Sequence, residues 1–246
     1  MKSDNSHTAM SIPDPVTTGI VTAAALQAAK QGQEFIAAAA GHPGESLGTI
    51  LGNLGRRRMH NAEAVGNKAH LTLLNIGVRA QEVPLNILQP LLESASLQED
   101  PSLQAIWANL LANAADPRQQ NKLEPVFTDI LRGLSSRDVR FLDELMTGLG
   151  NVETLELSEV DLANLYIKAG IARYVDFPNI GLSTRLLTAD NILGSENCSD
   201  FYRMMDIFEL YRILLKLPRV RENHIQEYVF TQLGRDFLRA CRKPKA

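Results

Sequence analysis

The chain has 246 residues, of which 45% are hydrophobic and 22% charged, and its formal net charge is −3. This composition is typical of a globular protein and excludes a disordered or fibrous chain. The two cysteines, Cys198 and Cys241, lie far apart in the sequence. Their separation excludes a CxxC zinc motif and a disulfide framework and favours a reducing compartment, so we expect a cytoplasmic protein.

The N-terminal part divides into a tail and a segment rich in Ala and Gly. Residues 1–14 contain no apolar run, which predicts a disordered tail without a secretory signal. The uncharged stretch from Pro15 to Ala29 is too short and too weakly apolar to span a membrane, because a spanning helix needs about 20 apolar residues. It predicts a helix that is buried or faces a partner.

Glycine then recurs every three or four residues, at Gly41, Gly44, Gly48, Gly52 and Gly55. This spacing favours close helix packing, and the cost of glycine inside a helix predicts a weak helix around residues 47–54. Residues 56–58 are all arginine, and we expect them near the C-terminal end of that helix, where cations complement its dipole. An amphipathic segment that ends in a basic cluster also leaves open a peripheral membrane contact through residues 15–58, and with it a growth-arrest protein that perturbs the membrane.

The central part predicts two helices. The first begins near Pro84, and Pro90 inside it predicts a kink or a break. The second begins at Asp100, whose side chain can accept hydrogen bonds from the first turn, with Pro101 in the first helical position. Its apolar residues keep helical spacing and predict a buried stripe that includes the only tryptophan: Leu103, Ile106, Trp107, Leu110, Leu111 and Ala114. Asn109 and Asn113 lie on the flank of this stripe, either in solvent or bonded to a neighbouring helix.

The C-terminal part predicts a winged-helix-like order of elements. Ser135 with Asp138, and Ser158 with Asp161, form capping patterns that each open a helix. An extended connection at residues 171–197 follows, then a helix over residues 201–216, a small β-hairpin with strands at residues 219–221 and 225–230, and a last helix capped by Thr231. Cys241 falls on the apolar side of that helix, as a small core residue.

The predicted fold class is therefore mainly α. It has a disordered tail at residues 1–14, a helical Ala/Gly-rich and central region at residues 15–133, and a winged-helix-like module with a small β-hairpin at residues 134–246.

No motif of catalysis, metal binding or cofactor binding occurs in the sequence. The five histidines form no HExxH pattern, the glycines at 41–55 match neither a phosphate loop nor a dinucleotide fingerprint, and no serine lies in a GxSxG elbow. We therefore expect a non-enzymatic protein without catalytic residues, metal or cofactor, which acts by surface recognition.

The charge distribution indicates where such a surface lies. Residues 200–246 carry 10 basic and 6 acidic residues, a net +4, which leaves −7 on residues 1–199. The helix and hairpin of the predicted module could meet the phosphates of duplex DNA, and so a DNA-binding regulator stays open beside a protein partner from phage or host. The candidate contact residues are Arg203, Arg212, Lys216, Arg219 and Arg221.

Two segments carry a resemblance to a known family. A Pro-Leu-Leu-Glu run at residues 90–93 is followed by Trp-Ala-Asn-Leu-Leu at residues 107–111, and Tyr-Val-Phe-Thr stands at residues 228–231. With their surroundings, which span roughly residues 47–241, these segments resemble the abortive-infection alpha family. The resemblance implies a bacterial protein with a part in abortive infection, in which an infected cell stops growing or dies before phage progeny emerge. It supplies no catalytic residue.

Overall fold

The computed structural model describes residues 15–52, 55–119, 123–148, 156–158, 161–164, 195–210, 214–216 and 227–245. The tail at residues 1–14 and residues 171–194 of the extended connection lie outside this part of the chain. Residues 161–164 are helical, as the Ser158 and Asp161 pattern predicts.

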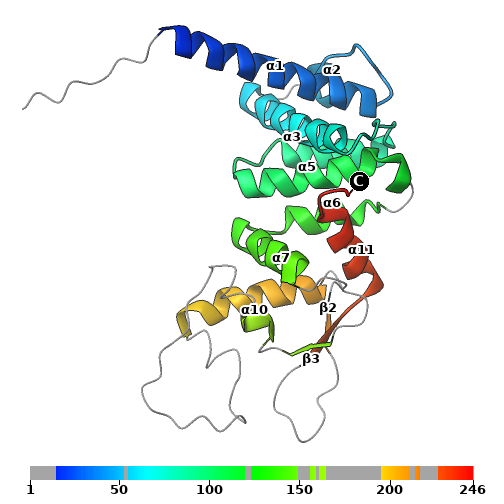
Figure 1. Ribbon diagram of the computed structural model, residues 1–246. Helices are drawn as coiled ribbons and strands as arrows, with labels where there is room; N and C mark the ends of the chain where they lie inside the picture. The colour runs from blue at the N-terminus through cyan, green and yellow to red at the C-terminus, as the bar shows by residue number, and fades with distance from the viewer. Residues whose placement is uncertain are drawn as a thin grey trace, which may run out of the picture.

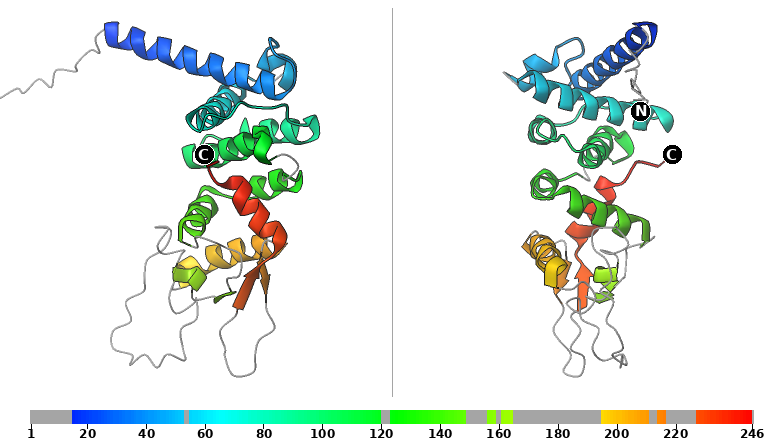
Figure 2. Two further views of the ribbon diagram at one scale, coloured as in Figure 1. Left: turned by 45° about the vertical axis from the view of Figure 1, so that its right-hand side comes forward. Right: turned by 90° about the vertical axis from the view of Figure 1, so that its left-hand side faces the viewer.

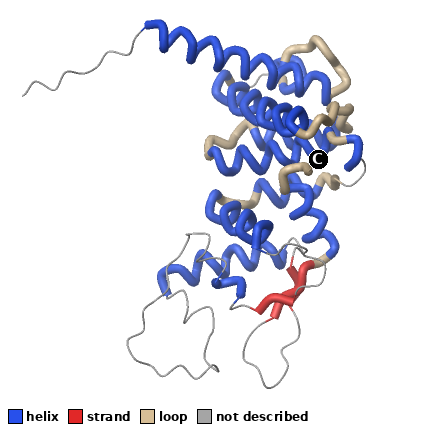
Figure 3. Tube along the Cα trace, viewed as in Figure 1, coloured by secondary structure: helices blue, strands red, loops and turns tan. Residues whose placement is uncertain are grey.

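Helices make up most of the described chain, so the predicted mainly helical class is confirmed (Figure 3). In chain order the elements are α1 (Pro15–Ala39), α2 (Leu47–Leu51), α3 (Arg56–Asn75), α4 (Leu85–Ala95), α5 (Pro101–Ala115), the 3-10 helix η1 (Pro117–Gln119), α6 (Val126–Arg132), α7 (Ser136–Gly148), β1 (Glu156–Ser158), α10 (Ser195–Leu210), β2 (Leu214–Lys216), β3 (Glu227–Phe230) and α11 (Gln232–Cys241).

The helices form an elongated stack (Figure 1). Helix α1 lies on α3, α3 on α5, and α5 on α7, and α10 follows at the far end (Figure 2). Rings link the last two layers, because Phe141 of α7 and Phe208 of α10 stack at a centroid distance of 6.1 Å. Helix α11 runs back along this stack from the sheet to α5. Its return brings the C-terminal part of the sequence against the central helix.

A small antiparallel sheet lies beside α10. The strand order is β1-β3-β2, with Leu157 opposite Tyr228 and Leu215 opposite Val229. The predicted helix over residues 201–216 is wrong at its end, because Leu214–Lys216 form strand β2, which pairs with β3. The predicted first hairpin strand at residues 219–221 lies outside the described residues. Apolar residues at 214 and 215 suit either conformation, and pairing with β3 is a long-range contact that helical spacing does not reveal. Strand β1 was not predicted.

Two glycines outside the predicted series bring α1 and α3 together. A Cβ on Gly32 would collide with the carbonyl oxygen of Glu63, and a Cβ on Gly66 would lie 2.8 Å from the carbonyl oxygen of Gly32. The predicted role for the series at 41–55 is wrong in its location, since Gly41, Gly44 and Gly52 have positive φ angles and form turns. The close approach of backbones therefore occurs between α1 and α3, and not at α2, where the glycine series predicts it.

Replacing Gly32 with alanine is expected to lower the free energy of unfolding by about 2 kcal/mol, because the added methyl forces the two helices apart and overpacking outweighs the gain in helix propensity. Gly48→Ala in α2 is the matched control. Its Cβ would meet Met59 at an ordinary 3.7 Å, so this change should be neutral or stabilising by up to about 1 kcal/mol. Urea unfolding of both variants checks the difference, and equal stabilities would contradict the close approach.

The three arginines at residues 56–58 begin α3, so their expected place at a helix C-terminus is wrong. Gly52, with φ 69°, ends α2 before them. Arg58 instead complements the dipole of α4, since its guanidinium donates to the Glu93 carbonyl at 3.2 Å and to Ser96 Oγ at 3.1 Å. Arg57 pairs with Glu99 at 2.7 Å. These contacts tie the start of α3 to the end of α4.

Pro90 does not break its helix, because α4 continues from Leu85 to Ala95. Proline removes a single backbone donor in the second turn. The last turn is held from outside by Arg132, which donates to Ser94 Oγ at 2.9 Å. Of the two alternatives predicted at Pro90, a kink or a break, the break is therefore wrong.

The predicted cap of α5 is confirmed. Asp100 Oδ1 accepts from the backbone N–H of Ser102 at 2.8 Å and of Leu103 at 3.0 Å, and Pro101 is the first helical residue. The hydrogen bond from Leu103 is the main cause that holds the pKa of Asp100 below its usual 3.8.

The stability that comes from this carboxylate has a defined pH window. Because the folded pKa is lower than the unfolded one, the contribution is full above pH 3.8 and is lost as the pH falls through the depressed folded value. Asp100→Asn keeps an acceptor for the cap but removes the titration, so its unfolding free energy should fall less steeply below about pH 4 than that of the wild type. Denaturant unfolding across the acid range measures both slopes, and parallel curves would contradict the assignment.

Candidate functional site

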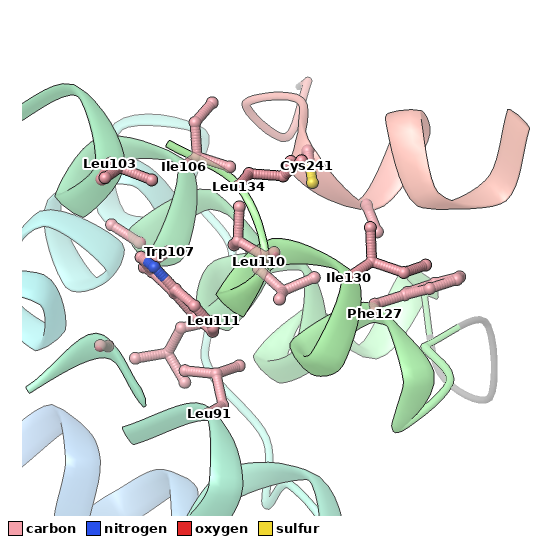
Figure 4. Packing of buried hydrophobic residues seen from close by; sticks show 14 of the residues in the cluster. Leu91, Leu103, Ile106, Trp107, Leu110, Leu111, Phe127, Ile130, Leu134 and Cys241 are labelled. Carbon is pink, nitrogen blue, oxygen red and sulfur yellow. The ribbon is translucent and has the colours of Figure 1, made fainter. Parts of the chain in front are cut away.

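Trp107 lies in the centre of the hydrophobic core, as predicted. Its side chain is 0% exposed, and it packs in the core beside Leu91 and Leu111 (Figure 4). All members of the predicted stripe are buried except Ala114, which is half-buried. The indole therefore has no surface to offer a ligand.

Two asparagines on the flank of that stripe hold the end of α11. Asn113 Nδ2 donates to the carbonyl of Ala240 at 2.8 Å and of Arg242 at 2.7 Å, and Asn109 Nδ2 donates to the carbonyl of Cys241 at 3.0 Å. The last carbonyls of a helix have no partner within it. The side chains of α5 thus supply donors that α11 lacks, and we call this set of contacts the asparagine clamp.

The residues after α11 continue the same attachment. The Arg118 guanidinium donates to the Lys245 carbonyl at 2.8 Å and pairs with the buried Asp116 carboxylate at 2.9 Å. Hydrogen bonding to Asp116 is the main cause that raises the pKa of Arg118. The C-terminal segment is therefore bonded to α5 and to η1 directly after it.

Asp138 joins α7 to α10. Its carboxylate accepts from the Ser135 N–H at 2.7 Å, which confirms the predicted capping pattern, and from the Arg203 guanidinium at 3.0 and 3.1 Å. The Asp138 side chain is 1% exposed and that of Arg203 is 45% exposed. One edge of the Arg203 guanidinium is thus bonded to Asp138, while the rest of the side chain is in contact with solvent.

The structure places two of the five candidate contact residues. Arg203 pairs with Asp138 as described above, and Lys216 lies in β2 opposite Tyr228. Arg212, Arg219 and Arg221 lie outside the described residues. Whether the five form one surface stays a prediction.

Cys241 occupies the core, in agreement with its predicted role. Its side chain is 0% exposed, and burial raises the pKa of its thiol. Within the described ranges, no three His, Cys, Asp or Glu side chains come together in a way that could hold a metal ion. The described helices include none with the length and hydropathy of a bilayer-spanning segment.

A pocket of about 480 Å³ opens between α1, α3 and the turn after α3. Its walls are mainly apolar, with Phe35 and Leu74 among them, and its polar lining residues are Gln31, Glu34, His70 and Arg79. The His70 ring lies 5.8 Å from the Phe35 ring. Our sequence analysis missed this pocket. One signal could have indicated it, because Leu74 lines the pocket but lies outside the buried stripe of α3 and is 61% exposed.

The fold and these contacts define a mainly helical protein in which the asparagine clamp holds α11 on the central helix α5. A family model described as abortive infection alpha matches residues 59–241, and the chain belongs to this family. The match contains both the tryptophan helix and the helix that it clamps. The comparison with curated proteins found no match, and neither did the comparison with solved structures.

Proposed function

We propose that the chain is a non-enzymatic abortive-infection protein that acts in a bacterial cell by binding a phage or host macromolecule. Membership of the abortive infection alpha family is the observation that carries the proposal. The described polar groups around α5 and α7 add support, since Asn113 and Asp138 make contacts between helices. Buried polar side chains that bond neighbouring helices stabilise the fold, and a stable helical scaffold suits a protein that acts by binding.

Plaque formation tests the defensive role. A strain that expresses the chain should show a lower plating efficiency across a phage panel than a matched strain with a stop codon early in the gene. Cell survival at high and low multiplicity distinguishes abortive infection from other defence. At low multiplicity the culture should be protected, and at high multiplicity the infected cells should die without progeny. Equal plating on both strains across the panel would count against the proposal.

A second candidate function is duplex-DNA binding through a winged-helix-like C-terminal module. The order α10, β2, β3, α11 and the antiparallel pairing of β2 with β3 favour it, since this order is that of a recognition helix followed by a wing. Lys216 in β2 adds a cation. Contacts with phosphates would make the binding fall steeply with salt.

Retention on duplex DNA at low salt tests this second candidate. Replacing Arg219 and Arg221 together with glutamate should abolish retention. The matched control makes the same change at two exposed arginines outside the module. Arg56 is the first residue of α3, and Arg79 follows that helix. If both variants lose retention equally, net charge rather than the module explains binding. A wild-type protein that passes through the column removes the candidate.

A further inference from the structure

We infer that two copies of this chain associate through antiparallel pairing of their α1 helices, about a two-fold axis near Ala29. The inference is independent of the proposed function, because it concerns assembly and not defence. It rests on the projecting first half of α1, of which residues 23–27 are exposed, on a self-complementary row of side chains along that helix, and on the pocket beside its second half.

The first half of α1 extends past the helix it packs on. The stripe that faces α3 is buried at Gly32 and Ile36, half-buried at Ala29 and exposed at Ala25. Figures 1 and 2 show this half of α1 projecting beyond α3. No charged residue occurs from Pro15 to Ala29. An isolated helix in water is marginal, and an uncharged helix surface is typical of one that packs against something.

A second side of α1 carries a row that suits pairing with a copy of itself. Ala24, Gln27, Gln31, Glu34 and Ala38 follow at intervals of three and four, so they share one side of the helix. Gln31, Glu34 and Ala38 line the pocket, and all five side chains are exposed or half-buried. The row is distinct from the side that packs on α3.

An antiparallel pairing about Ala29 makes this row complementary to itself. Gln27 of each copy then lies opposite Gln31 of the other, and each amide can both donate and accept. Ala24 lies opposite Glu34, so the uncharged half of one helix meets the half of the other that borders the pocket. An isologous interface requires such reciprocal contacts. One symmetry operation thus covers both surfaces, including the exposed Lys30–Glu34 pair at 3.8 Å.

A second copy fits this surface better than a lipid bilayer does. Binding to anionic lipid uses Lys and Arg on the polar side of an amphipathic helix, and residues 15–29 contain neither. Two glutamines in the middle of the row are costly against hydrocarbon but can pair with each other. In this register the charge-free segment faces the other copy's Lys30 and Glu34, and its lack of charge avoids like-charge repulsion with either.

The mass of the full-length chain in solution, measured by light scattering over a concentration series, tests the pairing. We expect the wild type to approach twice the 27.1 kDa of one chain as concentration rises. Ala24→Glu places a carboxylate opposite Glu34 of the other copy, and it should weaken association by at least about tenfold because like charges across an interface repel. Ala24→Lys offers Glu34 an opposite charge, and its dissociation constant should stay within about threefold of the wild-type value.

Leu26→Glu is the matched control. Leu26 is 73% exposed and lies about 200° around the helix from Ala24, so the same added carboxylate should leave association unchanged. A wild-type mass of one chain at every concentration overturns the pairing. Equal losses from all three substitutions overturn the proposed register. Flotation of the wild type with phosphatidylglycerol vesicles that Ala24→Glu abolishes would replace the second copy with a membrane.

Discussion

Replacing Trp107 with alanine is expected to lower the free energy of unfolding by about 3–5 kcal/mol, which is the usual cost of removing a buried aromatic side chain. The indole is 0% exposed and packs where α5 meets its neighbours in the stack, so the layers on both sides limit how far the site can collapse. For a chain of this length, this loss corresponds to a melting temperature lower by roughly 6–20 °C. Calorimetry and urea unfolding measure it.

Two further substitutions show whether the loss comes from burial. The Trp107 Nε1 group has no hydrogen-bond partner in the described part of the chain, so Trp107→Phe sacrifices volume but no hydrogen bond and should cost only about 1–2 kcal/mol. Leu26→Ala, at a 73% exposed position, should change stability by less than about 0.5 kcal/mol. A Trp107→Ala variant as stable as Leu26→Ala would show that the indole is not part of the core.

The second large effect is expected from Asn113→Leu. Asn113 is 5% exposed and donates to two carbonyls at the end of α11. Leucine has a similar size but no donor, so it leaves those carbonyls without that partner in a buried place. We expect a loss of about 2–4 kcal/mol, since each buried unsatisfied group costs about 1–3 kcal/mol.

The asparagine clamp also predicts where the damage appears. Amide hydrogen exchange should accelerate first in α11, because that helix loses its attachment while the stripe of α5 stays apolar. Asn86→Leu is the matched control, as Asn86 is exposed on α4 and the same change there should leave exchange in α11 unaltered. Uniform acceleration throughout the protein would indicate a general loss of stability rather than release of α11.

Features set by neighbouring residues could be predicted from the sequence. Asp100 with Pro101, Ser135 with Asp138, and Thr231 each satisfy backbone donors within a single turn, so local spacing was sufficient to place three helix starts. The stripe around Trp107 was equally clear because its period is that of the helix itself. These predictions needed no knowledge of the rest of the chain.

Features that depend on distant residues were missed or misplaced. The contact of Gly32 with Gly66 joins two helices, and strand β2 exists because β3 lies beside it. The local spacing of apolar residues is compatible with either a helix or a strand at residues 214–216. The place of the arginines at 56–58 was missed for the same reason, since the partners of Arg58 lie at the end of α4 and that of Arg57, Glu99, lies a few residues after it. Of the candidate contact residues, Arg203 had a buried partner that only the folded chain reveals.

The asparagine clamp also has a consequence for biosynthesis. Asn113 and its partner Ala240 are 127 residues apart. At a translation rate of about 5–20 residues per second, the ribosome needs roughly 6–25 s to deliver the second partner after the first. During that interval the flank of α5 is made but still lacks its partner, so the side-chain amides of Asn109 and Asn113 bond to water until α11 emerges.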